Sequence, residues 1–178
     1  MNQFETVSAT SLKNILDALP AFVFVVDKDV RIVEYNSAAA GLLKGSRISI
    51  INKRAGEALH CINSDVVPEG CGNAPSCMDC IIRNSVDIAF SGEKVSRQRA
   101  KIEINSGGVT TEIFAVITAS PLELDDKKLV LLQIEDISEL TAIQEVVQIC
   151  MKCKKVHNID EFWTALESYF KNSWGIDF

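Results

Sequence analysis

The front of the chain alternates between apolar runs and turn residues in a way that predicts a helix, a hairpin and a second helix. Residues 11–19 place leucine and isoleucine at helical spacing and end before a proline, whose ring cannot continue a helix. Residues 21–26 form a compact apolar run, and residues 30–35 alternate after an Asp-Lys-Asp turn. Asn36 is a good N-cap for a helix of small residues over positions 37–44.

After a cysteine-rich stretch, the pattern predicts one more helix and three strands. Residues 80–91 carry isoleucine, valine and alanine at helical spacing. Three further segments alternate between apolar and polar positions and are separated by turn residues, namely 96–104, 109–120 and 128–135. With a turn of helix at residues 54–59, the order is two strands, a helix, a variable middle, a helix and three strands. This order predicts a fold of the α+β class.

The last predicted strand runs directly into a helical pattern. Leu140, Ile143, Val147 and Cys150 recur at spacings of three, four and three, which is the rhythm of paired helices. The pattern therefore predicts an exit helix over residues 137–150. Two heptads suit a helix that packs on its own domain equally well.

Composition narrows the class of partner. The chain of 178 residues has a net charge of -6, from 18 basic and 24 acidic side chains. Nucleic-acid binding needs a clustered basic face. The basic residues Arg97, Arg99 and Lys101 alternate along a predicted strand and suit a solvent-exposed sheet face better than an anion-binding site. The chain opens without a signal-peptide pattern and contains no apolar run long enough to cross a membrane. We therefore expect a cytoplasmic protein with neither a nucleic-acid nor a membrane partner.

Cysteine carries the most distinctive chemistry of the sequence. Four of the six cysteines, Cys61, Cys71, Cys77 and Cys80, lie close together among glycines and prolines that let the backbone turn sharply. Four converging thiolates suit zinc and also suit an iron–sulfur cluster, and spacing does not separate the two. Disulfides are the competing interpretation, but cytosolic thiols stay reduced, and a chain of this length can fold without cross-links. We therefore expect these four residues to bind a metal ion or cluster.

The Cys77 and Cys80 pair also has an enzymatic interpretation. A Cys-x-x-Cys pair at a helix start is typical of thiol–disulfide oxidoreductases, because the helix N-terminus favours the thiolate. Such pairs are convincing beside a β-α-β pattern, which this sequence lacks. The sequence also has no Ser-His-Asp arrangement and no phosphate-binding Gly-x-x-x-x-Gly-Lys loop. We therefore expect a protein that is not an enzyme and keep the oxidoreductase as an alternative.

The order of elements and two short motifs resemble a known family. The segment V-V-D-K-D-V-R-I-V-E-Y-N-S-A-A-A-G-L-L-K-G at residues 25–45 resembles the opening of a PAS sensor domain. The segment L-L-Q-I-E-D-I-S at residues 131–138 is similar to that family's last strand and its exit into a signalling helix. The resemblance implies a five-stranded antiparallel sheet with helices on one face, a lead-in helix before it and a signalling helix after it. It divides the chain into a lead-in helix (1–19), a PAS-like domain (20–136) with a cysteine-rich insert at about 56–82, the exit helix (137–150) and a C-terminal module (151–178).

A narrower resemblance covers the cysteines. The segments G-E-A-L-H-C, G-C-G and C-M-D-C, at residues 56–61, 70–72 and 77–80, are similar to a cysteine-bearing subgroup of PAS domains in bacterial signalling proteins. The tail, with Cys150 and Cys153, resembles a short module that follows sensor domains in bacterial kinases and cyclases. In that module a further Cys-x-x-Cys usually comes just after the position where this sequence ends. The resemblance therefore implies that the tail holds a partial second metal site.

Together these observations predict a bacterial signal-transduction sensor module. We expect its four-cysteine site to bind an iron–sulfur cluster or zinc. The state of this site would be relayed through the exit helix to an effector such as a kinase or cyclase, in the same chain or another. A purely structural zinc ion that clamps the insert onto the sheet is a further alternative. The apolar stripes of the lead-in and exit helices also predict a homodimer.

Overall fold

The computed structural model describes residues 9–43, 45–124 and 126–141, together with residues 148–149, 155–157, 163–165, 168 and 171. The chain divides into two compact units, Met1–Asp136 and Ile137–Phe178. The first unit contains α1 (Ala9–Asp17), β1 (Phe22–Val26), β2 (Ile32–Tyr35), α2 (Ser37–Leu42), α3 (Arg47–Ile50), α4 (Ala55–Ala58), η1 (Ile62–Ser64), η2 (Pro75–Asp79), α5 (Ile81–Phe90), β3 (Val95–Ser106), β4 (Val109–Leu124) and β5 (Lys127–Asp136). The second unit contains β6 (Gln148–Ile149), β7 (Lys155–His157) and β8 (Trp163–Ala165).

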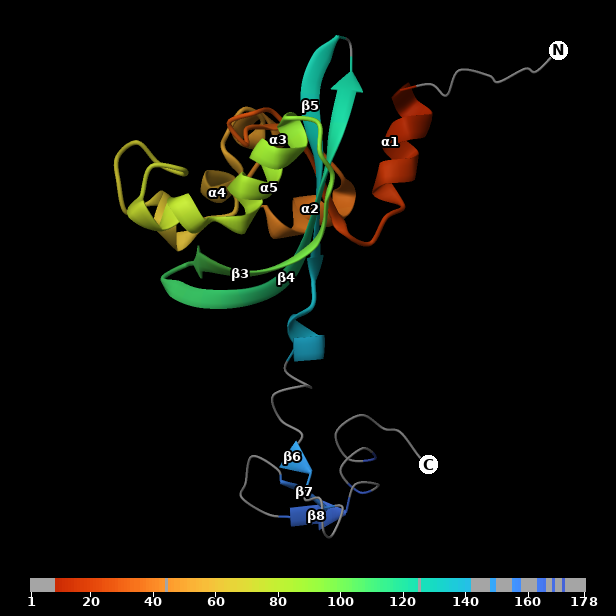
Figure 1. Ribbon diagram of the computed structural model, residues 1–178, viewed down its shortest axis with the longest axis vertical. Coiled ribbons are helices and arrows are strands. Elements are labelled where there is room, and N and C mark those ends of the chain that lie inside the picture. Colours follow the sequence, from red (N-terminus) through yellow and green to blue (C-terminus); the bar gives the residue numbers. More distant parts are fainter. Residues whose placement is uncertain are drawn as a thin grey trace, which may run out of the picture. The chain divides into compact units, whose positions relative to one another are not determined.

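The first unit is built on a five-stranded sheet with the order β2-β1-β5-β4-β3. All four pairs of neighbouring strands in this sheet are antiparallel. The first strand of the unit, β1, lies between β2 and the last strand of the unit, β5. Figure 1 shows α2, α3, α4 and α5 grouped on one side of this curved sheet. The α+β class and the five-stranded antiparallel sheet that the sequence predicts are therefore confirmed.

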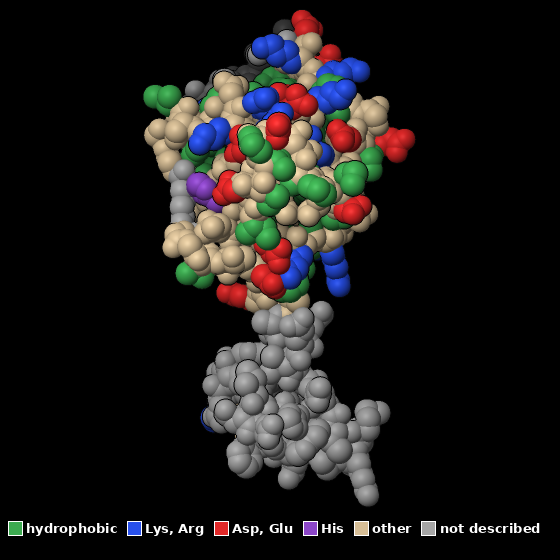
Figure 2. Space-filling view, turned by 90° about the vertical axis from the view of Figure 1, so that its left-hand side faces the viewer, with side chains coloured by type: hydrophobic (Ala, Val, Ile, Leu, Met, Phe, Trp, Pro, Cys, Tyr) green, Lys and Arg blue, Asp and Glu red, His purple; other side chains and the backbone are tan. Residues whose placement is uncertain are grey.

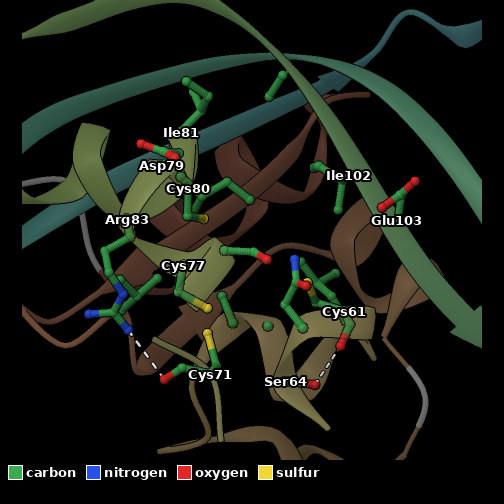
Figure 3. Close-up of a pocket in the computed structure, with 18 of the residues that line it drawn as sticks. Cys61, Ser64, Cys71, Cys77, Asp79, Cys80, Ile81, Arg83, Ile102 and Glu103 are labelled. Carbon is green, nitrogen blue, oxygen red and sulfur yellow. Dashed lines mark hydrogen bonds between the residues drawn. The ribbon is translucent and has the colours of Figure 1, made fainter. Parts of the chain in front are cut away.

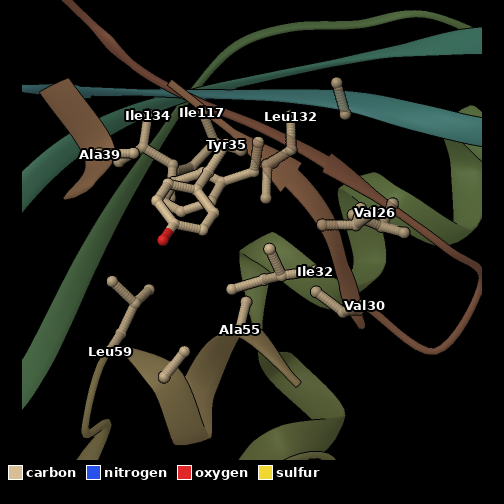
Figure 4. Packing of buried hydrophobic residues seen from close by; sticks show 14 of the residues in the cluster. Val26, Val30, Ile32, Tyr35, Ala39, Ala55, Leu59, Ile117, Leu132 and Ile134 are labelled. Atoms are coloured by element: carbon tan, nitrogen blue, oxygen red, sulfur yellow. The ribbon is translucent and has the colours of Figure 1, made fainter. Parts of the chain in front are cut away.

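The core lies between the sheet and these helices (Figure 4). Phe24 of β1 stands opposite Leu132 of β5 in the register, so the two side chains point to the same face of the sheet. Both are fully buried, as are Ile32 and Ile117 from the neighbouring strands. Burial of each such side chain contributes about 1.5–3 kcal/mol to the free energy of unfolding. The alternation read from the sequence therefore corresponds to one buried face of the sheet.

Asn36 connects the lead-in helix to the sheet and to α2. Its side chain is 1% exposed, and its Oδ1 accepts hydrogen bonds from the backbone N–H of Val23 (3.1 Å) and of Ala39 (3.0 Å). The two hydrogens of its Nδ2 are shared among three backbone carbonyl oxygens, from the last turn of α1 (Leu16) and from Leu19 and Ala21 before β1. The predicted N-cap is therefore confirmed, and the same side chain also fixes where α1 ends.

Helix α1 is held against the rest of the unit by polar contacts. The Lys13 Nζ donates to the carbonyl oxygen of Tyr35 (2.8 Å), and the backbone N–H of Ser37 donates to the Asp17 carboxylate (2.8 Å). The pKa of Asp17 is lowered by this backbone hydrogen bond and by the nearby Lys13. These contacts leave part of the apolar side of α1 exposed, including Ile15, which is 56% exposed.

The exit helix predicted for residues 137–150 is wrong at Gln148 and Ile149. Residues 138–141 are helical, but Gln148–Ile149 form β6, which pairs with β7 in a three-stranded sheet, β6-β7-β8. A short helix without a partner is marginal in water, whereas strand pairing gives these two residues backbone hydrogen-bond partners. Ile143, Val147 and Cys150 lie outside the described residues.

The basic side chains expected on one sheet face are largely paired with acids. Arg97 forms a salt bridge with Glu135 (3.2 Å), and Lys101 forms salt bridges with Glu112 (2.6 Å) and Glu103 (3.3 Å). Arg97 also lies in a β-bulge with a φ of 53°, so it departs from the regular alternation. On the face of the molecule shown in Figure 2, basic and acidic side chains are interspersed. Across the described segments, no helix has the length and apolar character needed to span a membrane.

Candidate metal centre

The structure brings the four clustered cysteines to one cavity of about 180 Å³ (Figure 3). Cys61 precedes η1, Cys71 lies in the loop before η2, Cys77 lies within η2, and Cys80 is the N-cap of α5. The other walls come from the sheet and the helices. They include Val30, Leu59, Ser76, Asp79, Ile81, Ile82, Arg83, Ala100, Lys101, Ile102 and Glu103.

The four cysteines differ in exposure and are all free thiols. Cys77 is buried, at 7% exposed, whereas the other three are half-buried. Figure 3 shows the sulfurs of Cys71 and Cys77 pointing toward each other, with Cys80 above Cys77 and Cys61 to the right of the pair. Within the described residues, no group of three or more His, Cys, Asp or Glu side chains is arranged so that it could hold a metal ion. The sulfurs therefore share a cavity without forming a closed coordination sphere.

Gly56 lets the cysteine loop pack directly against α4. A Cβ atom at Gly56 would lie 2.6 Å from the Cys71 sulfur and 3.5 Å from the Cys61 Cβ, so a side chain there collides with Cys71. Farther along the loop, Gly70 and Gly72 have φ values of 77° and 96°, which side-chain-bearing residues rarely adopt. The sharp turns that the sequence predicts around Cys71 are confirmed.

Backbone N–H groups donate hydrogen bonds to two of the sulfurs. The N–H of Gly56, in the first turn of α4, donates to Cys71, and the N–H of Asn63 donates to Cys61. Burial raises the pKa of both thiols, while these N–H donors lower it in part. Negative charge on the neighbouring thiols raises the pKa of Cys61 further. The cavity therefore favours the neutral thiol at Cys61 and Cys71, and a nearby cation would favour their thiolates.

His60 contributes its backbone rather than its imidazole. It has a φ of 55°, and its carbonyl oxygen accepts a hydrogen bond from the backbone N–H of Asn105 (2.8 Å). The next residue, Cys61, forms an isolated β-bridge with Ile104 of β3. A histidine next to Cys61 could replace a sulfur as a metal ligand, but His60 is not among the residues that line the cavity. The two backbone contacts attach the cysteine loop to an edge strand of the sheet.

The geometry does not favour the oxidoreductase alternative. The nucleophile of a thiol–disulfide exchange must be reached by another sulfur. Cys77 is buried, and it lies in a short 3₁₀ helix rather than in the first turn of a long α-helix.

The candidate partial site at Cys150 and Cys153 lies outside the described residues.

Comparison with known proteins supports the fold. No family model and no curated protein matches the sequence. The structure is similar to an RNA-binding light-oxygen-voltage receptor, with a TM-score of 0.54 at 12% identity over 82% of this chain and 38% of that chain. It is similar to the VqmA dimer of Vibrio cholerae, with a TM-score of 0.50 at 11% identity over 82% of this chain and 59% of that chain. It is also similar to the PAS domain of nitrogen regulation protein NR(II) from Vibrio parahaemolyticus, with a TM-score of 0.48 at 15% identity over 71% of this chain and 97% of that chain.

The contact at Gly56 gives a prediction with a matched control. Alanine in place of a helical glycine normally stabilises a protein by up to about 1 kcal/mol, and we expect this for Gly41→Ala, because nothing lies within 4 Å of the new Cβ. Gly56→Ala should instead destabilise the protein by about 1–3 kcal/mol, because the new methyl group displaces Cys71. Urea unfolding of both variants measures the difference. Equal stabilisation by both substitutions would contradict the packing described here.

Proposed function

We propose that this chain is a PAS-like sensor module of a bacterial signalling protein, with an iron–sulfur cluster or zinc held by Cys61, Cys71, Cys77 and Cys80. The observation that carries the proposal is that four thiols from separate elements line one cavity between the sheet and the helices. The sensor assignment is supported by the fold and by the resemblance of residues 25–45 and 131–138 to PAS domains.

The surroundings of the sulfurs suit thiolate ligands. Metal-binding thiolates accept hydrogen bonds from nearby N–H groups, which orient them and offset their charge. Cys71 and Cys61 accept such bonds from the backbone. When bound, an iron–sulfur cluster supplies a redox change, and zinc supplies a structural cross-link. The chain itself would contribute the sulfurs, the N–H donors and the partial exclusion of water.

The connection from the cysteine loop to the end of the first unit runs through the sheet. Cys61 is bridged to Ile104 of β3, β3 pairs with β4, and β4 pairs with β5. Strand β5 ends at Asp136, where the helical residues 138–141 begin. A change in how the loop packs would therefore reach the chain exit through hydrogen-bonded strands, and from there an effector such as a kinase or cyclase.

Exposed apolar side chains in α1 and in the helical residues after β5 are consistent with the predicted homodimer. Ile15 of α1 is 56% exposed, and Leu140, just after β5, is 62% exposed. Burial of each in a dimer would contribute about 1.5–3 kcal/mol to association. A second copy of the chain is the partner we propose for these residues.

Metal analysis of the anaerobically purified protein tests the centre. The wild type should contain either iron and sulfide, with a brown colour, or zinc without colour. Replacing Cys71 and Cys77 together by serine should remove the metal, because both sulfurs face the cavity. Replacing Cys150 and Cys153 together by serine removes the same number of thiols from the tail and should leave the metal held by the four clustered cysteines in place. A wild type without metal, or a reversal of the two variants, would contradict the proposal.

Sedimentation over micromolar concentrations tests the homodimer. The double variant Ile15→Asp/Leu140→Asp should raise the dimer dissociation constant at least tenfold, since a tenfold change corresponds to about 1.4 kcal/mol. Val109→Asp is the control, because Val109 is equally exposed, at 65%, but lies in the hairpin between β3 and β4. A wild type that stays monomeric, or a dimer indifferent to the double variant, would be evidence against this interface.

A further inference from the structure

One basic side chain lies directly against the cysteine centre. Arg83 is in the first turn of α5, three residues after Cys80. Its Nη2 donates a hydrogen bond to the Cys71 carbonyl oxygen at 3.5 Å (Figure 3). Burial raises the pKa of the Cys71 thiol, and the interaction of its side chain with Arg83 offsets part of that rise. The same guanidinium therefore contacts both the backbone and the side chain of one proposed ligand.

The backbone beside Cys71 is shaped to accept this guanidinium. A Cβ atom at Gly72 would lie 2.6 Å from the Arg83 Cζ, so any side chain there would displace the arginine. Gly72 also has a φ of 96°, which favours glycine. The guanidinium thus lies on a bare stretch of backbone that connects Cys71 to η2.

Arg83 has no carboxylate partner in the described part of the chain, where all the salt bridges involve other basic residues. Lys101, the other basic residue that lines the cavity, is paired with Glu112 and Glu103. Asp79 is a further acidic residue among those lining the cavity. Arg83 is half-buried, and burial of a cation costs less beside compensating negative charge. The groups placed against its guanidinium are the carbonyl oxygen and the thiol of Cys71, and the thiol would supply that charge as a thiolate.

We propose that Arg83 is the counter-charge of the cysteine centre, positioning Cys71 and setting the affinity of the four sulfurs for a metal ion. This inference rests on the proposed function, because it requires that the sulfurs bind a metal. Four thiolates around a divalent ion carry a net charge of about -2 in a partly dehydrated cavity. A fixed guanidinium in contact with one of the sulfurs offsets part of this charge.

Cobalt(II) titration of the full-length protein, followed by zinc competition, tests the inference. Arg83→Gln should weaken metal affinity by about 10- to 100-fold, the usual effect of removing a group that supports a metal ligand. Arg83→Lys keeps the charge and should recover most of that loss. Arg99→Gln removes the same charge from an exposed position on β3 and should match the wild type. Asp79→Asn removes a negative charge from the cavity wall and should strengthen binding.

The outcomes separate this inference from the proposed function. A wild type that binds neither cobalt nor zinc overturns both. A wild type that binds metal, with an Arg83→Gln variant of unchanged affinity, overturns only the role of Arg83. If Arg83→Lys is as weak as Arg83→Gln, the charge has no role and the inference is wrong. If Arg83→Gln does not fold, Asp79→Asn still tests the inference. Metal binding by that variant that is unchanged or weaker would contradict the claim that charge around the sulfurs sets their metal affinity.

Discussion

The cysteine centre depends on the close approach of Cys71 to the backbone of Gly56. Because Gly56 has no Cβ, the sulfur of Cys71 can lie against the first turn of α4 and accept a hydrogen bond from its N–H. The loop that returns toward η2 can then deliver Cys77 and Cys80 to the same cavity. A side chain at position 56 would push the loop outward, and the four sulfurs would no longer share one space.

The sheet holds the cysteine loop in place. β3 supplies one wall of the cavity and also holds the cysteine loop through the β-bridge between Cys61 and Ile104. The same strand is connected through β4 to β5, whose end is the end of the first compact unit. At the opposite side of the cavity, α5 contributes Cys80 and Arg83 from its beginning. The proposed centre therefore contacts both the sheet and the helical layer. A change in its ligands or charge would alter its packing against the sheet.

Local patterns were enough to predict most of the fold. Alternation located four strands of the main sheet, a compact apolar run located β1, and Asn36 correctly marked the start of α2. The short elements α3, η1 and η2 have too few residues to show a period, so they were not predicted. The exit helix was extended too far, because an apolar rhythm of two heptads does not exclude the strand pairing seen at Gln148–Ile149.

The convergence of the four cysteines was predictable from the sequence, whereas the groups around them were not. The spacing of the cysteines among glycines predicted that they converge, and the structure places all four at one cavity. The roles of Gly56 and Arg83 depend on contacts with Cys71 across 15 and 12 positions of the chain, and no local pattern reports such contacts. A glycine inside an otherwise helical segment, as at Gly56, was the one available signal of a close backbone approach.

X-ray absorption spectroscopy at the edge of the bound metal tests the central claim most directly. The suitable protein carries Cys150→Ser and Cys153→Ser, which leaves four of the six cysteines, namely those at the cavity. Our account predicts four sulfur neighbours at about 2.3 Å around zinc or iron, with an additional iron–iron distance if a cluster is present. A first shell made mainly of nitrogen or oxygen, at about 2.0–2.1 Å, would contradict it.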